Sequence, residues 1–303
     1  MTGGAIRAGS RRHGAKTCLL AAVLGLAGAA IAGCVRAAPT AEPVRTQAPT
    51  LAQTQAQPRP TTAARAAPGS GPRRSGFDFM SPSTQAMQKD DSQNPAMLWV
   101  QDGEALWNRN AGKRERSCAG CHGAAPAAMR GVAARYPAYD AAAQRPVNLS
   151  GRINLCRTRH QQAEPFAAES QELLGIEAYV AFQSRGLPIV AAADPALAAF
   201  RERGRKFYQQ RIGQLDLACA QCHDDNAGQR LGGSVIPQAH PTGYPIYRLE
   251  WQGMGSLQRR LRNCLTGVRA ESFPFGAQEL VEIELYLFAR AAGMPIETPA
   301  VRP

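Results

Sequence analysis

Residues 1–76 almost lack acidic side chains, since ten Lys and Arg residues are accompanied there by a single acid, Glu42. This segment therefore carries +9 of the formal net charge of +12, and residues 77–303 carry only +3. The chain also lacks a basic run interleaved with aromatic residues, which a nucleic-acid-binding surface usually has. The excess charge belongs to the N-terminal segment, and no nucleic-acid partner is predicted.

A hydrophobic run long enough to span a membrane is absent as well. The apolar stretch at residues 18–33 has sixteen residues, whereas a spanning helix needs about 20. It follows a basic segment and ends in Ile-Ala-Gly-Cys34. This pattern predicts a Sec-type signal peptide over residues 1–34, with Cys34 acylated as in a bacterial lipoprotein. Cleavage after small residues slightly downstream is the alternative.

Aromatic residues are missing between residues 35 and 76, where Pro, Ala, Thr, Gln and Arg predominate. Such a segment cannot bury enough apolar surface to offset the entropy lost on ordering. We therefore predict a disordered linker at residues 35–76 and a folded region that begins near Phe77.

Two C-x-x-C-H motifs are present, at Cys118–His122 and Cys219–His223. In an exported protein this motif attaches a c-type haem, and its histidine is the proximal ligand of the iron. A zinc site would need four ligands in matched pairs, and a thioredoxin-type site would not need the histidine. The predicted covalent attachments are Cys118 and Cys121 for haem 1 and Cys219 and Cys222 for haem 2, with His122 and His223 as the proximal iron ligands.

The two motifs belong to a longer internal repeat. A segment with an aromatic residue at a matching position, Gly103–Trp107 or Gly204–Tyr208, precedes each motif by the same distance. A predicted amphipathic helix follows each motif, at Gln171–Tyr179 and Gln278–Tyr286, and a Gly-x-Pro-Ile sequence comes after it. This repeat predicts a mostly α chain with two cytochrome c-like domains in tandem, each with one covalently attached haem. The predicted domains are residues 77–192 and 193–303.

Two further cysteines, Cys156 and Cys264, are 108 residues apart, close to the 107-residue offset of the closing helices. A disulfide between them and two inert buried thiols are both alternatives. Their matching positions favour a local role in each half, as the second axial ligand of each haem iron. The rival ligands, led by His160 for haem 1, are Met129, His160, His240, Met254 and Met294.

The segment around Cys264 has the features of a helix, which Ser256 can cap and Gly267 can end. Arg260 comes four residues before Cys264 and therefore lies on the same side of that helix. Its guanidinium offers a planar fork of donors to an oxyanion.

Other arginines near the two cysteines are assigned to the surface or stay unassigned. Arg259 and Arg262 are predicted to point away from Cys264, toward solvent or a partner, whereas Arg269 is not assigned. Before Cys156, the region that contains Arg152 reads as a loop because of Gly151 and Asn154. The first half is therefore not expected to repeat the arrangement around Cys264.

With these features the chain resembles the SoxA family, the dihaem cytochrome subunit of the bacterial thiosulfate-oxidising Sox system. The resemblance rests on the two haem motifs with their downstream cysteines and on the stretches His240–Trp251 and Gly255–Cys264. It covers about residues 94–296. It implies that Cys264 is both a ligand of the second iron and a persulfide nucleophile, and that Arg260 binds thiosulfate.

The resemblance also implies an activity and partners. SoxA-family proteins are periplasmic L-cysteine S-thiosulfotransferases that form a heterodimer with a SoxX-type monohaem cytochrome c. They couple thiosulfate oxidatively to a cysteine of the SoxYZ carrier and pass the electrons to cytochrome c. A lipid anchor at Cys34 would tether this chain to a membrane, unlike most of the family. The main alternative is a dihaem electron carrier without sulfur transfer; a haem-thiolate sensor and a dihaem peroxidase are others.

Overall fold

The computed structural model describes residues 72–303. The predicted signal peptide, with Cys34, and most of the predicted linker lie outside the described residues. Contacts with the folded body begin before Phe77, since the Arg73 guanidinium donates to the Ala292 carbonyl at 2.7 Å and Ser75 caps the first short helix. No helix within residues 72–303 is both long and apolar enough to cross a membrane.

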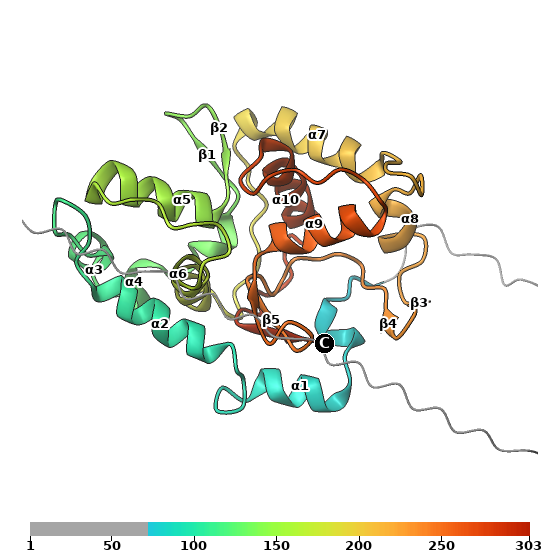
Figure 1. Cartoon of the computed structure of the whole chain (residues 1–303), viewed down its shortest axis with the longest axis horizontal. Helices are drawn as coiled ribbons and strands as arrows, with labels where there is room; N and C mark the ends of the chain where they lie inside the picture. Colours follow the sequence, from blue (N-terminus) through green and yellow to red (C-terminus); the bar gives the residue numbers. More distant parts are fainter. Residues whose placement is uncertain (1–71) are drawn as a thin grey trace, which may run out of the picture. The chain divides into compact units, whose positions relative to one another are not determined.

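The two haem motifs lie in equivalent series of elements (Figure 1). In each half a long helix leads to the motif, and a two-stranded antiparallel pair, a helix with the lone cysteine and a closing helix follow. The first series is α2 (Met97–Asn108), α3 (Cys118–His122), β1 (Ala138–Asp140), β2 (Arg145–Val147), α5 (Leu149–Cys156) and α6 (Gln171–Phe182). The second is α7 (Ala198–Gln209), α8 (Cys219–His223), β5 (Ile246–Arg248), β6 (Gly253–Gly255), α9 (Leu257–Gly267) and α10 (Gln278–Arg290).

Shorter elements complete the described chain, and β7 adds a parallel strand to β5. They are η1 (Gly76–Phe79), α1 (Pro82–Lys89), α4 (Ala125–Ala128), η2 (Ala133–Arg135), η3 (Arg157–Gln161), η4 (Pro195–Leu197), β3 (Arg230–Leu231), β4 (Ser234–Val235) and β7 (Ala300–Arg302).

Glycines let the entering and closing helices of each half touch. In the first half α2 packs on α6, and in the second α7 packs on α10. A Cβ atom added at Gly103 would clash with the carbonyl oxygen of Gly175. One added at Gly204 would clash with the carbonyl oxygen of Glu282. Each half thus depends on a glycine at the same place in the repeat, because any side chain there would push the helices apart.

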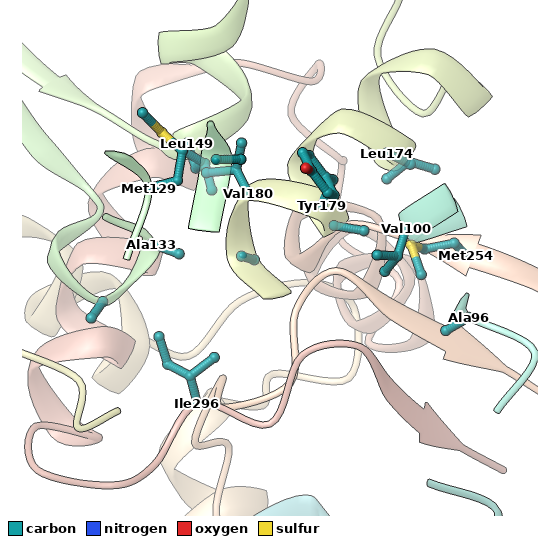
Figure 2. Close-up of a cluster of buried hydrophobic side chains, with 14 of the residues drawn as sticks. Ala96, Val100, Met129, Ala133, Leu149, Leu174, Tyr179, Val180, Met254 and Ile296 are labelled. Carbon is teal, nitrogen blue, oxygen red and sulfur yellow. The ribbon is translucent and has the colours of Figure 1, made fainter. Parts of the chain in front are cut away.

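Two clusters of buried apolar side chains form the core. One fills the first half and extends to the C-terminal residues, with Met254 beside Val100 and with Ile296 on the side of Ala133 (Figure 2). The other lies within the second half. Its buried members are Tyr208, Leu257, Leu265, Leu280, Ile283 and Leu287.

The two Gly-x-Pro-Ile sequences of the repeat pair with each other. The Ile189 amide donates to the Met294 carbonyl at 2.9 Å, and the Ile296 amide donates to the Leu187 carbonyl at 2.9 Å. Pro188 and Pro295, which are equivalent in the repeat, face each other in this antiparallel bridge. Equivalent residues that face each other in an antiparallel pair are related by a local two-fold axis.

The prediction of a loop before Cys156 is wrong, because residues Leu149–Cys156 form helix α5. The Asn148 side chain accepts the Gly151 amide at 2.9 Å and so caps this helix. Asn154 does not break it, since its side-chain amide bonds the backbone of Phe166 at 3.0 and 2.8 Å. Arg152 therefore lies on a helix four residues before Cys156, just as Arg260 precedes Cys264.

A buried pair of carboxyl groups lies between the two halves, at equivalent positions of α6 and α10. Glu177 and Glu284 both line a cavity of about 40 Å³. Glu284 accepts a hydrogen bond from Asn148 at 3.2 Å. Glu177 as a residue keeps some exposed surface, but its Oε2 is fully buried and has no partner. Burial and, after it, the nearby Glu284 carboxylate raise the pKa of Glu177, to about 8.

The glycine contact between α7 and α10 predicts that one added methyl group at Gly204 destabilises the protein strongly. Gly204→Ala should lower the free energy of unfolding by about 1–3 kcal/mol, because the helices must separate to admit it. Urea denaturation followed by circular dichroism of the holoprotein would measure this change. Gly267→Ala, at the end of α9 where an added Cβ meets no atom within 4 Å, is the matched control and should cost nothing. Equal stability of the two variants would contradict the proposed contact.

The raised pKa of Glu177 predicts that its contribution to stability falls as pH rises. Between pH 4.5, its ordinary pKa, and about pH 8 the folded state holds a proton that the unfolded state releases. Glu177→Gln should therefore raise the melting temperature more at pH 8 than at pH 5, by about 2–4 °C for each kcal/mol removed. Glu172→Gln, an exposed change on the same helix, should keep the wild-type pH profile. An unchanged profile in Glu177→Gln would refute the buried, protonated carboxyl.

Candidate functional site

The second haem motif lies on the short helix α8, with its histidine held by the backbone. The Nδ1 atom of His223 hydrogen-bonds the Pro237 carbonyl at 2.7 Å. Since a carbonyl only accepts, Nδ1 carries the proton and Nε2 is left as the ligand atom. Burial lowers the pKa of His223, which favours the neutral imidazole that binds a metal.

Helix α9 brings Cys264 to this motif. Its ends agree with the prediction, since the Ser256 side chain accepts the Arg259 amide at 3.1 Å and the helix ends at Gly267. Cys264 is close enough to Cys219 that, after burial, its charge is the largest cause that raises the pKa of the Cys219 thiol, to about 11. Its charge also raises the pKa of the Cys222 thiol, after burial as the main cause. The structure therefore brings the lone thiol and the C-x-x-C-H motif of the second half together.

Apolar side chains surround this meeting point. Cys219 packs with the buried cluster of the second half. Leu257, Leu261 and Leu265, one face of α9, belong to the same cluster. The expected apolar face of the helix that carries Cys264 is thus present, and it lies against the haem-attachment segment.

Arg260 lies near the same haem motif, in a positively charged environment. Its charge lowers the pKa of His223 and that of Arg248, in each case after burial as the main cause. The Tyr244 hydroxyl is within range of both Arg260 and Cys264. No carboxylate of residues 72–303 forms an ion pair with Arg260, so its charge is free to meet an anion.

The remaining arginines of this region are not simply solvated. The Arg259 guanidinium lies 4.1 Å from the centre of the Trp251 ring, and that of Arg262 lies 4.4 Å from the Phe275 ring. Arg262 also donates to the Phe273 carbonyl. Arg269 is exposed with φ of 57°, and its carbonyl accepts from the loop that precedes α8.

The first motif is arranged in the same way but is more open. Cys156 on α5 is close to Cys118, whose pKa is raised to about 11 by burial and then by the Cys156 charge. It is also close to Cys121. His122 is exposed and its ring lies 5.8 Å from that of Trp107. In contrast to His223, it makes no hydrogen bond with any described residue through Nδ1.

The structure places the rival axial ligands in three different environments. Met129, Met254 and Met294 are buried in the first apolar cluster. His160 is exposed, in the π-helical turn η3. The Nδ1 atom of His240 bonds the Arg74 carbonyl at 2.8 Å. Cys156 lies near Cys118 and Cys264 lies near Cys219, so the two lone thiols are not paired with each other.

These donor sets fit a c-type haem. Each C-x-x-C-H motif faces one further thiol, and apolar side chains line the space between them. Within residues 72–303 no three His, Cys, Asp or Glu side chains are close enough to hold a bare metal ion. Cys118, Cys121, His122 and Cys156 would hold one haem, and Cys219, Cys222, His223 and Cys264 would hold the other.

Comparisons with known proteins agree with this geometry. A family model described as the SoxA/TsdA cytochrome c domain matches residues 102–189. An L-cysteine S-thiosulfotransferase subunit SoxA from Pseudaminobacter salicylatoxidans is 37% identical over 75% of this chain and 80% of its own length. The chain belongs to the SoxA family.

Other SoxA-family proteins give the same result. The SoxA subunit from Rhodovulum sulfidophilum is 35% identical over 76% of this chain and 80% of its own length. The crystal structure of SoxXA from P. pantotrophus matches with a TM-score of 0.73 and 33% identity, covering 76% of this chain and 87% of that one. A cytochrome c fold and c-type haem chemistry follow from these matches; the two-domain division and the number of haems remain predictions.

The sequence reasoning missed three residues near the arginines of the two cysteine helices. They are Asp140 and Tyr136 beside Arg152, and Arg248 beside Arg260. The 108-residue offset between Cys156 and Cys264 would have pointed to all three, because it aligns Asp140 with Arg248 and Tyr136 with Tyr244.

Proposed function

We propose that this chain is the catalytic subunit of an L-cysteine S-thiosulfotransferase, which couples thiosulfate oxidatively to a cysteine of the SoxYZ carrier. The observation that carries the proposal is the position of Cys264, beside its haem motif and one helical turn from an arginine that has no carboxylate partner among residues 72–303. The relatives named L-cysteine S-thiosulfotransferase subunit SoxA support it.

Cys264 is the proposed nucleophile and sulfur carrier, as a persulfide, and the distal ligand of haem 2. Arg260 binds the thiosulfate dianion, because a guanidinium stays charged and offers two parallel donors to oxyanion oxygens. The Tyr244 hydroxyl lies within electrostatic range of the same pair. The apolar face of α9 keeps water from the opposite side of the thiol.

The overall reaction joins the carrier thiol and thiosulfate. A sulfur–sulfur bond forms between the carrier cysteine and the sulfane sulfur of thiosulfate, the thiol proton is released, and two electrons leave. When bound, c-type haems accept such electrons singly and pass them to an external cytochrome c. The chain's own residues hold the substrate anion at Arg260 and present the thiol at Cys264.

The first half is proposed to be a second cytochrome c-like domain, residues 77–192, whose haem transfers electrons or stabilises the fold. Residues 193–303 form the domain with the active site. Arg152 pairs with Asp140 at 2.8 Å and is not available to a substrate as Arg260 is. A SoxX-type monohaem cytochrome is the proposed heterodimer partner, in line with the match to a SoxXA structure.

The proposed location is the periplasm, because c-type haems attach to exported chains and the N-terminus has the pattern of a signal peptide. An acylated Cys34 would tether the protein to a membrane through the Pro- and Ala-rich linker.

Removal of the proposed nucleophile should abolish turnover. Cys264→Ala, assayed with the SoxX-type partner, SoxYZ and thiosulfate, should reduce cytochrome c at less than about a hundredth of the wild-type rate. Cys156→Ala, the equivalent change in the first half, is the matched control and should lose far less. Full turnover by Cys264→Ala with both haems retained would overturn the proposal. The alternative function, a dihaem electron carrier without sulfur transfer, would then be favoured.

The mass of the mature protein should show two covalently attached haems. It should also show about 32 Da more on the peptide with Cys264, for one added sulfur atom, and either an acylated Cys34 or a trimmed N-terminus. The oxidised protein should give the narrow g-spread of low-spin histidine–thiolate haems by electron paramagnetic resonance. A mass for one haem, or a histidine–methionine spectrum, would contradict the assigned ligands.

A further inference from the structure

One position of the repeat carries opposite charges in the two halves. Asp140 is the last residue of β1, and Arg248 is the last residue of β5. They are 108 residues apart, as Arg152 and Arg260 are. Each therefore stands in the same place relative to the arginine on its cysteine helix.

In the first half the residue at this position, Asp140, neutralises the charge of Arg152 on the cysteine helix. The Asp140 side chain is 3% exposed and lies 2.8 Å from Arg152 and 3.0 Å from Arg159. The Ala143 amide also donates to it at 2.8 Å. Hydrogen bonds from Arg159 and Ala143 hold the pKa of Asp140 down, to about 2, so the carboxylate stays charged at any ordinary pH.

In the second half the same position adds a positive charge. The Arg248 side chain is only 13% exposed, and its Nε is fully buried without a hydrogen-bond partner. Burial lowers the pKa of Arg248, and the nearby Arg260 lowers it further. Its one carboxylate, Glu250 at 3.0 Å, is 51% exposed, so water screens that pair. Gly267 stands where the first half has Arg159.

Two half-buried guanidiniums, one of them with a buried and unpaired Nε donor, are an unfavourable arrangement unless an anion joins them. We propose that Arg248 is a second anion-binding residue, which acts with Arg260 on a small divalent sulfur oxyanion, and that Asp140 closes the first half to such anions. This inference rests on the proposed function and deepens it, because it assigns the difference between the halves to one position.

The alternative for Arg248 is a purely structural contact, since its guanidinium also lies 5.1 Å from the centre of the Trp251 ring. Arg259 contacts the same ring at 4.1 Å and carries the same charge. Arg259→Ala is therefore a matched control that removes an equal charge and an equal stacking partner outside the proposed anion site.

The first experiment measures thiosulfate binding to the oxidised holoprotein by calorimetry, together with steady-state turnover. Arg248→Ala should raise the Kd and the KM at least tenfold with kcat changed less than threefold, because the residue binds the substrate without reacting. Arg248→Lys should recover part of the affinity, and Arg248→Asp should lose at least a hundredfold. Arg259→Ala should stay within twofold of wild type.

The second experiment tests the closed site. Asp140→Asn frees Arg152 and should add a second, weaker thiosulfate site per chain. If this variant keeps its haem spectrum but still binds one thiosulfate, the role of Asp140 is overturned. If Asp140→Asn does not keep its haems, the loss of thiosulfate binding in Arg248→Asp tests the role of this position, because that change places the aspartate of the first half at the equivalent position of the second half.

The outcomes separate this inference from the proposed function. If Arg260→Ala and Cys264→Ala abolish turnover but Arg248→Ala binds thiosulfate as wild type does, only the inference fails. If Arg248→Ala and Arg259→Ala weaken binding equally, the effect is general electrostatics and the specific role is lost. If the wild-type protein binds no thiosulfate, both fail together.

Discussion

The close contact of two helix backbones at a glycine is the constraint on which each half depends. Gly103 on α2 and Gly204 on α7 let the entering helix touch the closing helix directly. That contact fixes where the C-x-x-C-H motif begins, because the motif follows the entering helix after a tight loop. The cysteine helix packs against the same closing helix. The thiol and the motif meet because both are placed from one backbone contact.

On this shared scaffold the two halves differ in charge and exposure. Both present a thiol, an arginine one turn earlier and a tyrosine near that arginine. The first half adds a buried carboxylate to the arginine, and its haem histidine is exposed. The second half adds a second arginine and orients its histidine through the Pro237 carbonyl. The two halves therefore share one arrangement of elements but differ in electrostatic environment, and the environment of the second half is the one that favours an anion.

Much of this arrangement could be predicted from local sequence. The Ser256 cap and the apolar spacing determine α9, because both act within a few residues. Helix α5 was predicted to be a loop because of Gly151. The Gly151 amide in fact donates to the Asn148 side chain, which caps the helix. The aromatic contacts of Arg259 and Arg262 and the pairing of Asp140 with Arg152 depend on the tertiary fold. Periodicity shows which side of a helix a residue occupies, but not which neighbour another segment brings to it.

The pairing of the two Gly-x-Pro-Ile sequences bears on the ancestry of the chain. Each copy bonds to its own duplicate across a local two-fold axis. Two separate single-haem chains with this sequence could make the same contact as a symmetric homodimer. Gene fusion would then keep an interface that already existed and release the two copies from identical sequence. The equivalent residues Glu177 and Glu284 line one cavity, as such an arrangement predicts, whereas the equivalent residues Asp140 and Arg248 carry opposite charges.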